Sequence, residues 1–450
     1  MMMRNINPLI QQLCEEYERN AHIPPEDFEI FGVKRGLRNA DGTGVMAGIT
    51  KIGSVQGYIM RDGERVPTPG QLFYRGIDVQ EIVDGFLSEK RQGMSETAYL
   101  LLFGSLPNRL EYAAFTQLLN SNSFLPFGWV EDIFRKHASS NIMNMLSRSV
   151  MALYAHDDNP DDISVPNMMR QCVRLIAVFP SIVASAYAAQ QPGYSHDENM
   201  EQQSERTIAE NFLYRLRPDH QFTAEEAELL DICMVLHAEH GGGNNSAFTC
   251  RVLASSATDT YSAISGAVNS LKGPLHGGAN LKVLDMFDDI RANIRDYSDD
   301  DEIRAYLAKI LRGEAGDKSG KIYGMGHAVY TVSDPRTLIL KQYARQLADD
   351  RGGQIRDDFG LLCSIERLAP SVFDSHKGGK IISANVDFYS GSVYQMLGIP
   401  RELFTPLFAI ARVSGWAAHR IEEAVFGGRI IRPAYKAITL ENRYVPMEDR

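Results

Sequence analysis

The sequence predicts an almost entirely α-helical fold with a small β region near the N-terminus. Apolar residues recur at helical spacing through most of the 450 residues, a pattern typical of helices that bury one face. Only residues 44–76 combine Gly, Thr, Val and Ile with turn signals, as short strands do. We find neither a fixed-period repeat nor a low-complexity tract. We therefore expect a globular protein of fifteen to twenty helices.

Each element has its own signal along the chain. The apolar pattern over residues 5–20 predicts an amphipathic helix, and Asp62-Gly63 marks a turn in the β region. A capping box of Thr223 and Glu226 starts one later helix. Residues 190–203 are polar and unperiodic, so we expect a surface loop there. The other predicted helices cover residues 96–106, 108–121, 142–155, 168–189, 207–216, 223–238, two helices within 246–271, 279 onward, 299–312, 335–350 and 403–425.

Composition limits the class of function. A net charge of −11 and a pI near 5.5 argue against a nucleic-acid-binding surface. The five cysteines are scattered and odd in number, which is typical of reduced thiols and predicts a cytoplasmic protein without a zinc knuckle. The longest apolar run, 175–189, is too short for a membrane span and contains Pro180. We expect it to be a buried core helix, kinked or broken at that proline, and we see no secretory signal at the N-terminus.

His276 lies at a predicted break between two helices, in the sequence LKGPLHGGAN. Proline stops the first helix, and two glycines let the backbone approach a ligand closely. The N-terminus of the following helix favours bound anions and a neutral imidazole. A neutral imidazole can polarise a carbonyl group. The alternative is an ordinary loop histidine beside a turn.

Three other histidines lie in glycine-containing motifs. His237 and His240 lie three residues apart in LHAEHGGGNNS, a spacing that also suits a metal pair or two structural histidines. No third ligand is arranged to complete a metal site, so we favour substrate contact by His240 and Asn244. His327 follows Gly-x-Gly in YGMGHAVYTVSDPR, which lacks the third glycine of a dinucleotide fingerprint.

Four further charged residues stand out. Asp387 lies at a loop–helix junction among apolar neighbours, where burial can raise a carboxyl pKa enough for a general base; a helix cap is the alternative. Arg412 is the only charged residue in 403–418, and a buried guanidinium needs an anion. Arg336 near a helix N-terminus also favours a shared anion. Arg432 could supply a second carboxylate clamp.

Taken in order, these motifs resemble the citrate synthase family: LHAEHGGGNNSAFT, NSLKGPLHGGAN, GMGHAVYTVSDPR, NVDFYSG, ARVSGWAAHRIEE and IIRP. The resemblance implies that Asp387 removes a proton from acetyl-CoA, that His276 binds the thioester oxygen, and that His327 donates to the oxaloacetate carbonyl. Ser246 would orient His276. The oxaloacetate carboxylates would be held by His240, Arg336, Arg412 and Arg432.

The family also implies an architecture: a two-domain helical fold and a homodimer. The large domain would comprise 1–277 and 392–450 and the small domain 278–391, with Arg432 reaching the partner's site. No cofactor or metal is implied, since acetyl-CoA is a substrate. Many members have Arg where this chain has Ala328, so we name Lys318 and Lys321 as candidate CoA contacts.

Three alternatives stay open at this stage. One is 2-methylcitrate synthase with propionyl-CoA, because one methylene changes affinity by only about 1–3 kcal/mol. The second is a citryl-CoA-cleaving lyase. The third, from another class, is a non-catalytic, metal-binding helical protein.

Overall fold

The computed structural model describes residues 7–39, 41–62, 64–191, 206–378, 382–439 and 441–450. It is mainly helical, with one three-stranded antiparallel sheet in the order β1-β2-β3, and this confirms the predicted fold class. The strands are β1 (Gly53–Arg61), β2 (Glu64–Tyr74) and β3 (Ile77–Asp78). The α-helices are α1 (Pro8–Asn20), α2 (Asp27–Ile30), α3 (Val79–Ser88), α4 (Met94–Phe103), α5 (Arg109–Ser121), α6 (Ile142–Leu153), α7 (Val165–Ala188), α8 (Ile208–Leu216), α9 (Ala224–His237), α10 (Asn245–Ala254), α11 (Thr260–Leu271), α12 (Ala279–Asn293), α13 (Asp300–Leu311), α14 (Pro335–Arg351), α15 (Gly353–Lys377), α16 (Asp387–Met396) and α17 (Phe404–Phe426).

The chain divides into two compact units. One comprises residues 1–47 and 432–450, and the other comprises residues 48–431. In the first unit, α1 exposes every residue, and an antiparallel bridge pairs Arg38 with Gly44. The predicted large and small domains, split at residues 277 and 391, are a different division and stay a prediction.

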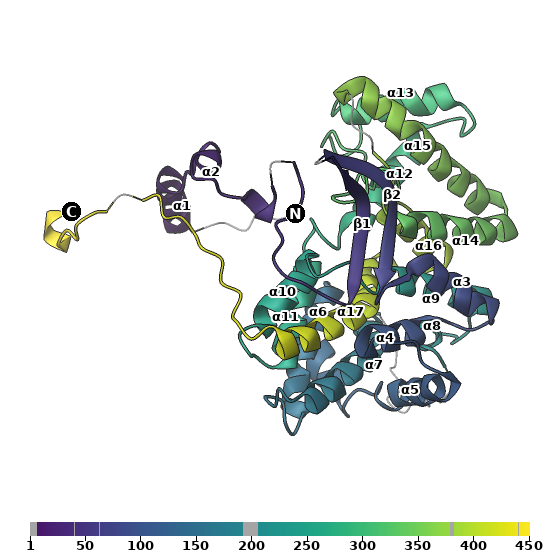
Figure 1. The fold of residues 1–450 in the computed structure, drawn as a ribbon. Helices are drawn as coiled ribbons and strands as arrows, with labels where there is room; N and C mark the ends of the chain where they lie inside the picture. Colours follow the sequence, from purple (N-terminus) through teal and green to yellow (C-terminus); the bar gives the residue numbers. More distant parts are fainter. Residues whose placement is uncertain (1–6, 40, 63, 192–205, 379–381, 440) are drawn as a thin grey trace. The chain divides into compact units, whose positions relative to one another are not determined.

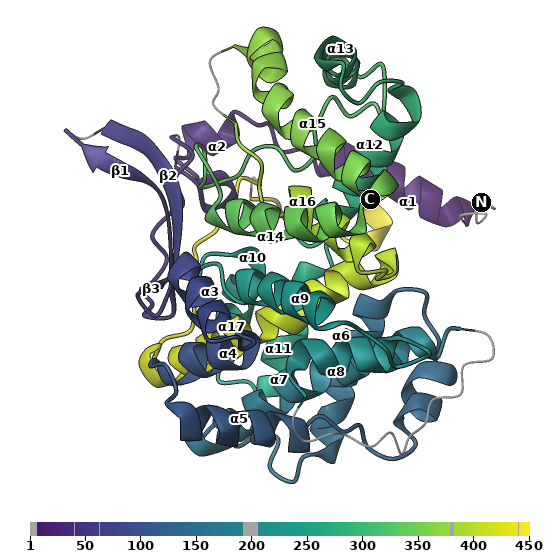
Figure 2. The ribbon, with the colours of Figure 1, turned by 90° about the vertical axis from the view of Figure 1, so that its right-hand side faces the viewer.

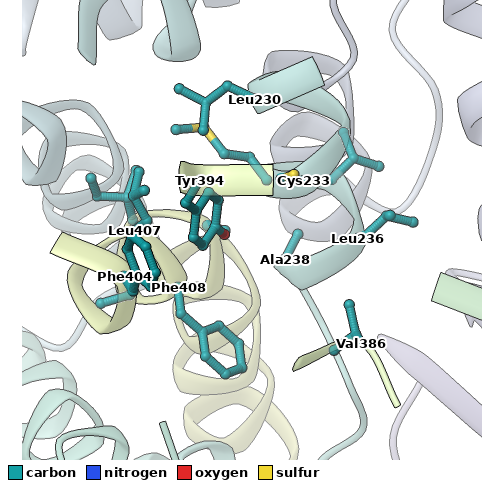
Figure 3. Packing of buried hydrophobic residues seen from close by; sticks show 14 of the residues in the cluster. Leu230, Cys233, Leu236, Ala238, Val386, Tyr394, Phe404, Leu407 and Phe408 are labelled. Carbon is teal, nitrogen blue, oxygen red and sulfur yellow. The ribbon is translucent and has the colours of Figure 1, made fainter. Parts of the chain in front are cut away.

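Helix α17 is the central packing element of the larger unit. It contacts α4, α7, α9, α10 and α11 (Figures 1 and 2). Figure 3 shows part of this core, where Phe404, Leu407 and Phe408 of α17 lie beside Tyr394 of α16 and the buried face of α9. A second group forms where α12 packs on α16, and α14 and α15 pack on each other. The sequence-predicted site residues of this unit come from both groups: Arg412 lies in α17, whereas Arg336 and Asp387 lie in α14 and α16.

Local signals explain several helix boundaries. The capping box of Thr223 and Glu226 is present at α9 and confirms that prediction. Pro180 lies inside α7 and does not end it, so the helix continues past the expected break. By length and composition α7 could cross a membrane, but 89% of its most apolar window is buried within the protein, as in a core helix. The predicted loop 190–203 falls almost wholly outside the described residues.

The β1–β2 hairpin packs on the loop that precedes α14. The Gly70 N–H donates to the Ser333 carbonyl (3.0 Å), and the Tyr330 hydroxyl donates to the Gln71 carbonyl (3.3 Å). A Cβ on Gly70 would overlap both Ser333 and the Tyr330 ring. Only glycine therefore allows the strand and the loop to come this close.

We expect Gly70→Ala to lower the free energy of unfolding by about 1–3 kcal/mol, the usual cost of overpacking. The matched control is Gly85→Ala in α3, where an added Cβ would meet no atom within 4 Å; it should be neutral or slightly stabilising, since Ala favours helices. Thermal unfolding of both variants measures the difference. Equal melting temperatures would contradict the close docking of hairpin and loop.

Candidate active site

His276 lies in the short segment between α11 and α12, as the Gly-Pro and Gly-Gly signals predicted. Its Nε2 lies 3.0 Å from the Ser246 hydroxyl oxygen. That hydroxyl also accepts a hydrogen bond from the Trp416 indole (3.1 Å) and lies 2.9 Å from Asn244 Oδ1. Burial lowers the pKa of His276 to about 4, and the positive charge of Arg412 adds to the shift. The imidazole is therefore neutral at pH 7.

His240 and His327 come together from distant parts of the chain. Their rings meet edge to face, with centroids 5.3 Å apart. The His327 ring stacks on Tyr330 at 4.7 Å, and Tyr330 also meets the edge of His240. Burial and the nearby charge of Arg336 hold the pKa of His240 well below its ordinary value. Its Nε2 is buried and has no partner among the described residues, so it is available to a ligand.

The backbone sets the tautomer of His327. The amides of Val329 and Tyr330 both donate to Nδ1 of the ring, each at 3.0 Å. Nδ1 must therefore be an acceptor, and the neutral ring carries its hydrogen on Nε2. His327 thus provides an N–H donor whose orientation is fixed by its own loop.

Asp387 is the first residue of α16, where the sequence placed it at a loop–helix junction. Its backbone N–H donates to Asn385 Oδ1 (3.0 Å), and Asn385 Nδ2 donates to the Gly326 carbonyl (2.9 Å). These bonds tie the loop of Asp387 to the loop of His327. Burial raises the pKa of Asp387 to about 6; Arg336 and Arg412 oppose this shift, and Asp334 adds to it. Such a carboxylate can accept a proton near neutral pH.

Arg336 already has an anion within the protein. Its Nε and one terminal nitrogen donate to the two carboxylate oxygens of Asp334, at 3.0 and 2.7 Å. Asp334 also accepts from the backbone N–H groups of Arg336 and Val386. Although burial opposes it, this pairing raises the pKa of Arg336. Asp334 thus balances the cation at the N-terminus of α14 and links this helix to the residue before Asp387.

Arg412 is fully buried in α17. Its Nε donates to the His237 carbonyl (2.6 Å), and its guanidinium lies over the Phe408 ring at 4.7 Å. Both terminal nitrogens lack a hydrogen-bond partner among the described residues. Burial lowers the pKa of Arg412 to about 10, and the negative charge of Glu239 is the largest opposing effect. The guanidinium stays charged at pH 7 with its terminal donors available to an anion.

Contacts connect six of the predicted residues into one cluster. The Phe408 ring touches both Arg412 and His276, with ring centroids of Phe408 and His276 6.2 Å apart. The charge of Arg412 acts on the pKa of His240, His276 and Asp387. We call this set the histidine–arginine cluster: His240, His276, His327, Arg336, Asp387 and Arg412. Ser246 borders the cluster through its hydrogen bond to His276, and Asn244 contacts Ser246 in turn.

Three predicted residues are not placed in the cluster. Arg432 belongs to the other compact unit and is exposed. Lys318 and Lys321 are exposed on the segment after α13. Their proposed contacts therefore stay predictions.

His237 has a packing role in this structure. Its Nδ1 lies 2.7 Å from the Cys233 carbonyl one helical turn back, and its ring meets Phe408 edge to face. Burial lowers its pKa to about 3. In the described ranges, no group of three or more His, Cys, Asp or Glu side chains is close enough to hold a metal ion. His237 and His240 therefore have different surroundings: His237 packs against Phe408, and His240 packs against His327 and Tyr330.

Sequence reasoning gave no role to Tyr330, Asp334 or Glu239. Asp334 was visible two residues before Arg336, but only the helix cap geometry shows that it forms a bidentate pair. Tyr330 acts through ring stacking, and no local sequence signal reveals that contact. Glu239 lies directly before His240, and its side chain is fully buried.

Comparison with known proteins shows the family of this chain. A family model described as "Citrate synthase, C-terminal domain" matches residues 39–434. The chain belongs to the citrate synthase family. A citrate synthase from Synechocystis sp. is 35% identical over 430 residues, covering 94% of this chain and 95% of that protein. A 2-methylcitrate synthase from Shewanella oneidensis is 33% identical over 380 residues, covering 84% and 92%.

Solved structures of citrate synthases share the fold. The Thermotoga maritima citrate synthase has a TM-score of 0.71 at 29% identity, covering 90% of this chain and 98% of that one. The Thermoplasma acidophilum citrate synthase, in ternary complex with carboxymethyl coenzyme A and oxaloacetate, has a TM-score of 0.74 at 26% identity, covering 93% and 99%. The predicted family and acyltransferase class are confirmed. These relatives do not support the non-catalytic alternative.

We expect Asp334→Ala to lower the free energy of unfolding by about 3–5 kcal/mol, because it leaves the buried Arg336 guanidinium without its carboxylate. The control is Asp349→Ala, which removes an exposed carboxylate from the same helix and should change stability by no more than about 0.5 kcal/mol. Urea unfolding measures both. A small effect at Asp334 would show that another group balances Arg336.

Proposed function

We propose that the protein condenses acetyl-CoA with oxaloacetate and hydrolyses the citryl-CoA intermediate to citrate and CoA. The observation that carries this proposal is the histidine–arginine cluster itself. It combines a carboxylate of raised pKa, neutral imidazoles and a buried guanidinium with unpaired donors. Such a set can remove a carbon-bound proton and stabilise developing oxyanions without a metal.

Oxaloacetate binding is the first step. The two unpaired terminal nitrogens of Arg412 suit a carboxylate, which can accept both hydrogen bonds. The unpartnered Nε2 of His240 offers one further contact nearby. Arg336 adds positive charge, but its Asp334 partner occupies two of its donors, so it would bind the ligand with those that remain. Asn244 lies next to this group, since its side chain contacts Ser246.

His327 would activate the ketone of oxaloacetate. Its Nε2–H is held as a donor by the two backbone amides at Nδ1. A fixed neutral donor aimed at the carbonyl oxygen makes the carbon electrophilic and stabilises the alkoxide that forms. One such donor is worth about 2.7–4 kcal/mol in the transition state.

Asp387 and His276 would generate the nucleophile. Asp387 takes a proton from the acetyl methyl group while His276 donates to the thioester oxygen. The Ser246 hydroxyl has one hydrogen, which it gives either to Asn244 Oδ1 or to His276 Nε2. Donation to Nε2 leaves the hydrogen of His276 on Nδ1, where it can reach the thioester. Water then hydrolyses citryl-CoA.

The assembly of the enzyme is also part of the proposal. Residues 278–391 would form a small domain that closes on a large domain of 1–277 and 392–450 after oxaloacetate binds. The packing of α12 with α16 and of α14 with α15 supports this division. A homodimer would bring Arg432 of the partner subunit to the site, and Lys318 and Lys321 would contact CoA phosphates. The five free cysteines support a cytoplasmic location.

A second candidate is 2-methylcitrate synthesis from propionyl-CoA. The Shewanella oneidensis relative carries that name at an identity close to that of the citrate synthases. The histidine–arginine cluster would serve both reactions, since the acyl donors differ by one methylene.

Initial rates of thiol release with acetyl-CoA and propionyl-CoA, each with oxaloacetate, test the proposal. We expect the higher kcat/KM with acetyl-CoA, and a higher value with propionyl-CoA would favour the second candidate. Asp387→Ala should abolish condensation and leave the oxaloacetate dissociation constant within about threefold, because the variant keeps Arg412 and His240. Turnover within tenfold of the wild type would reject Asp387 as the base.

The rate should depend on the ionisation of Asp387. Its pKa is raised to about 6, so the base is protonated and inactive at lower pH. We expect kcat/KM for acetyl-CoA to fall about tenfold per unit below pH 6 and to level off above it. His276 stays neutral across this range because its pKa is about 4. A profile that is flat down to pH 5 would contradict this assignment.

A further inference from the structure

Glu239 lies directly behind the cluster and is fully buried. Two glycines border its side chain: a Cβ on Gly53 would lie 2.8 Å from Glu239 Cγ, and a Cβ on Gly415 would lie 2.5 Å from Glu239 Oε2. Gly53 opens β1, and Gly415 lies within α17. The carboxylate therefore occupies a slot between strand and helix that only glycines leave open.

The Glu239 carboxylate holds the loop that follows α9. Its Oε1 accepts from the Gly241 backbone N–H (2.5 Å) and from His419 Nε2 (2.9 Å). Gly241 has a φ of +81°, a conformation that favours glycine. Gly242 packs on Arg251 and His419, since a Cβ there would lie 3.1 Å from Arg251 Nε and 3.4 Å from His419 Cε1. The loop between His240 and Asn244 thus rests directly on these buried side chains.

Arg251 determines which nitrogen of His419 carries hydrogen. Its Nε and a terminal nitrogen donate to Nδ1 of His419, at 3.1 and 2.7 Å. An arginine has no acceptor, so Nδ1 keeps its lone pair and the hydrogen is on Nε2. Arg251 itself is fixed by ion pairs with Glu422 and Glu423.

We propose that Arg251, His419 and Glu239 form a positioning relay for the oxaloacetate-binding loop. Arg251 holds His419 in the Nε2–H tautomer, His419 holds the Glu239 carboxylate, and Glu239 fixes the Gly241 N–H and the direction of His240. None of the three touches substrate in this role. The inference deepens the proposed function, on which it rests, by assigning oxaloacetate affinity to residues outside the cluster.

The test compares His419→Leu with His419→Gln. Leucine removes both ring contacts, whereas glutamine offers an amide oxygen to Arg251 and an amide N–H to Glu239. We expect His419→Leu to raise the oxaloacetate dissociation constant and KM at least tenfold, with the acetyl-CoA KM within about twofold, and glutamine to restore binding to within threefold of wild type. The control is Ser414→Ala, which changes another buried polar residue of α17. This variant should bind oxaloacetate with the affinity of the wild type.

Three results would overturn the relay. One is normal oxaloacetate affinity in His419→Leu, and another is a parallel rise in both KM values that glutamine does not correct. Should the leucine variant fail to fold, ¹⁵N-histidine NMR of the wild type decides: hydrogen on Nε2 alone supports the relay, and hydrogen on Nδ1 rejects it. Calorimetry separates the two proposals, because a wild type that binds no oxaloacetate refutes the proposed function itself.

Discussion

The candidate site is organised around the Arg412 guanidinium, which is fully buried inside the central helix α17. Removing an ion of this size from water costs several kcal/mol even after relaxation. The protein compensates only in part, with the His237 carbonyl, the Phe408 ring and the charge of Glu239. Among the residues that the structure describes, the two terminal nitrogens of Arg412 have no hydrogen-bond partner. In the function proposed above, a carboxylate of the substrate would supply these partners.

The other charges of the cluster follow from this constraint. Positive charge from Arg412 and burial together keep His276 uncharged, so the imidazole acts as a dipole and not as a second cation. Arg336 would increase the positive charge of the cluster further, but its ion pair with Asp334 neutralises the guanidinium. Burial raises the pKa of Asp387, and the positive charges of Arg336 and Arg412 lower it. The pKa therefore rises only to about 6. Burial and the charge of Arg412 thus act on the protonation of both His276 and Asp387.

Much of this site could be predicted from the sequence, because its signals are local. Glycines and prolines next to His276 and His327 mark backbone breaks, and an isolated charge in an apolar run marks Arg412. The Glu239–His419 pair could not be predicted, since 180 residues separate its partners. Helix α15 was also not predicted: two glycines at its start and an internal Pro370 conceal it. Stacking of His327 on Tyr330 depends on ring orientation, which residue spacing does not specify.

The docking of the hairpin on the loop before α14 has a consequence for biosynthesis. Gly70 and Ser333, which hydrogen-bond to each other, lie 263 residues apart in the chain, so the ribosome must release most of the polypeptide before they can meet. Until then β1 and β2 have an unpaired surface while the nascent chain emerges at about 5–20 residues per second. The contact between the hairpin and the loop before α14 therefore forms late, after the chain has been synthesised as far as Ser333.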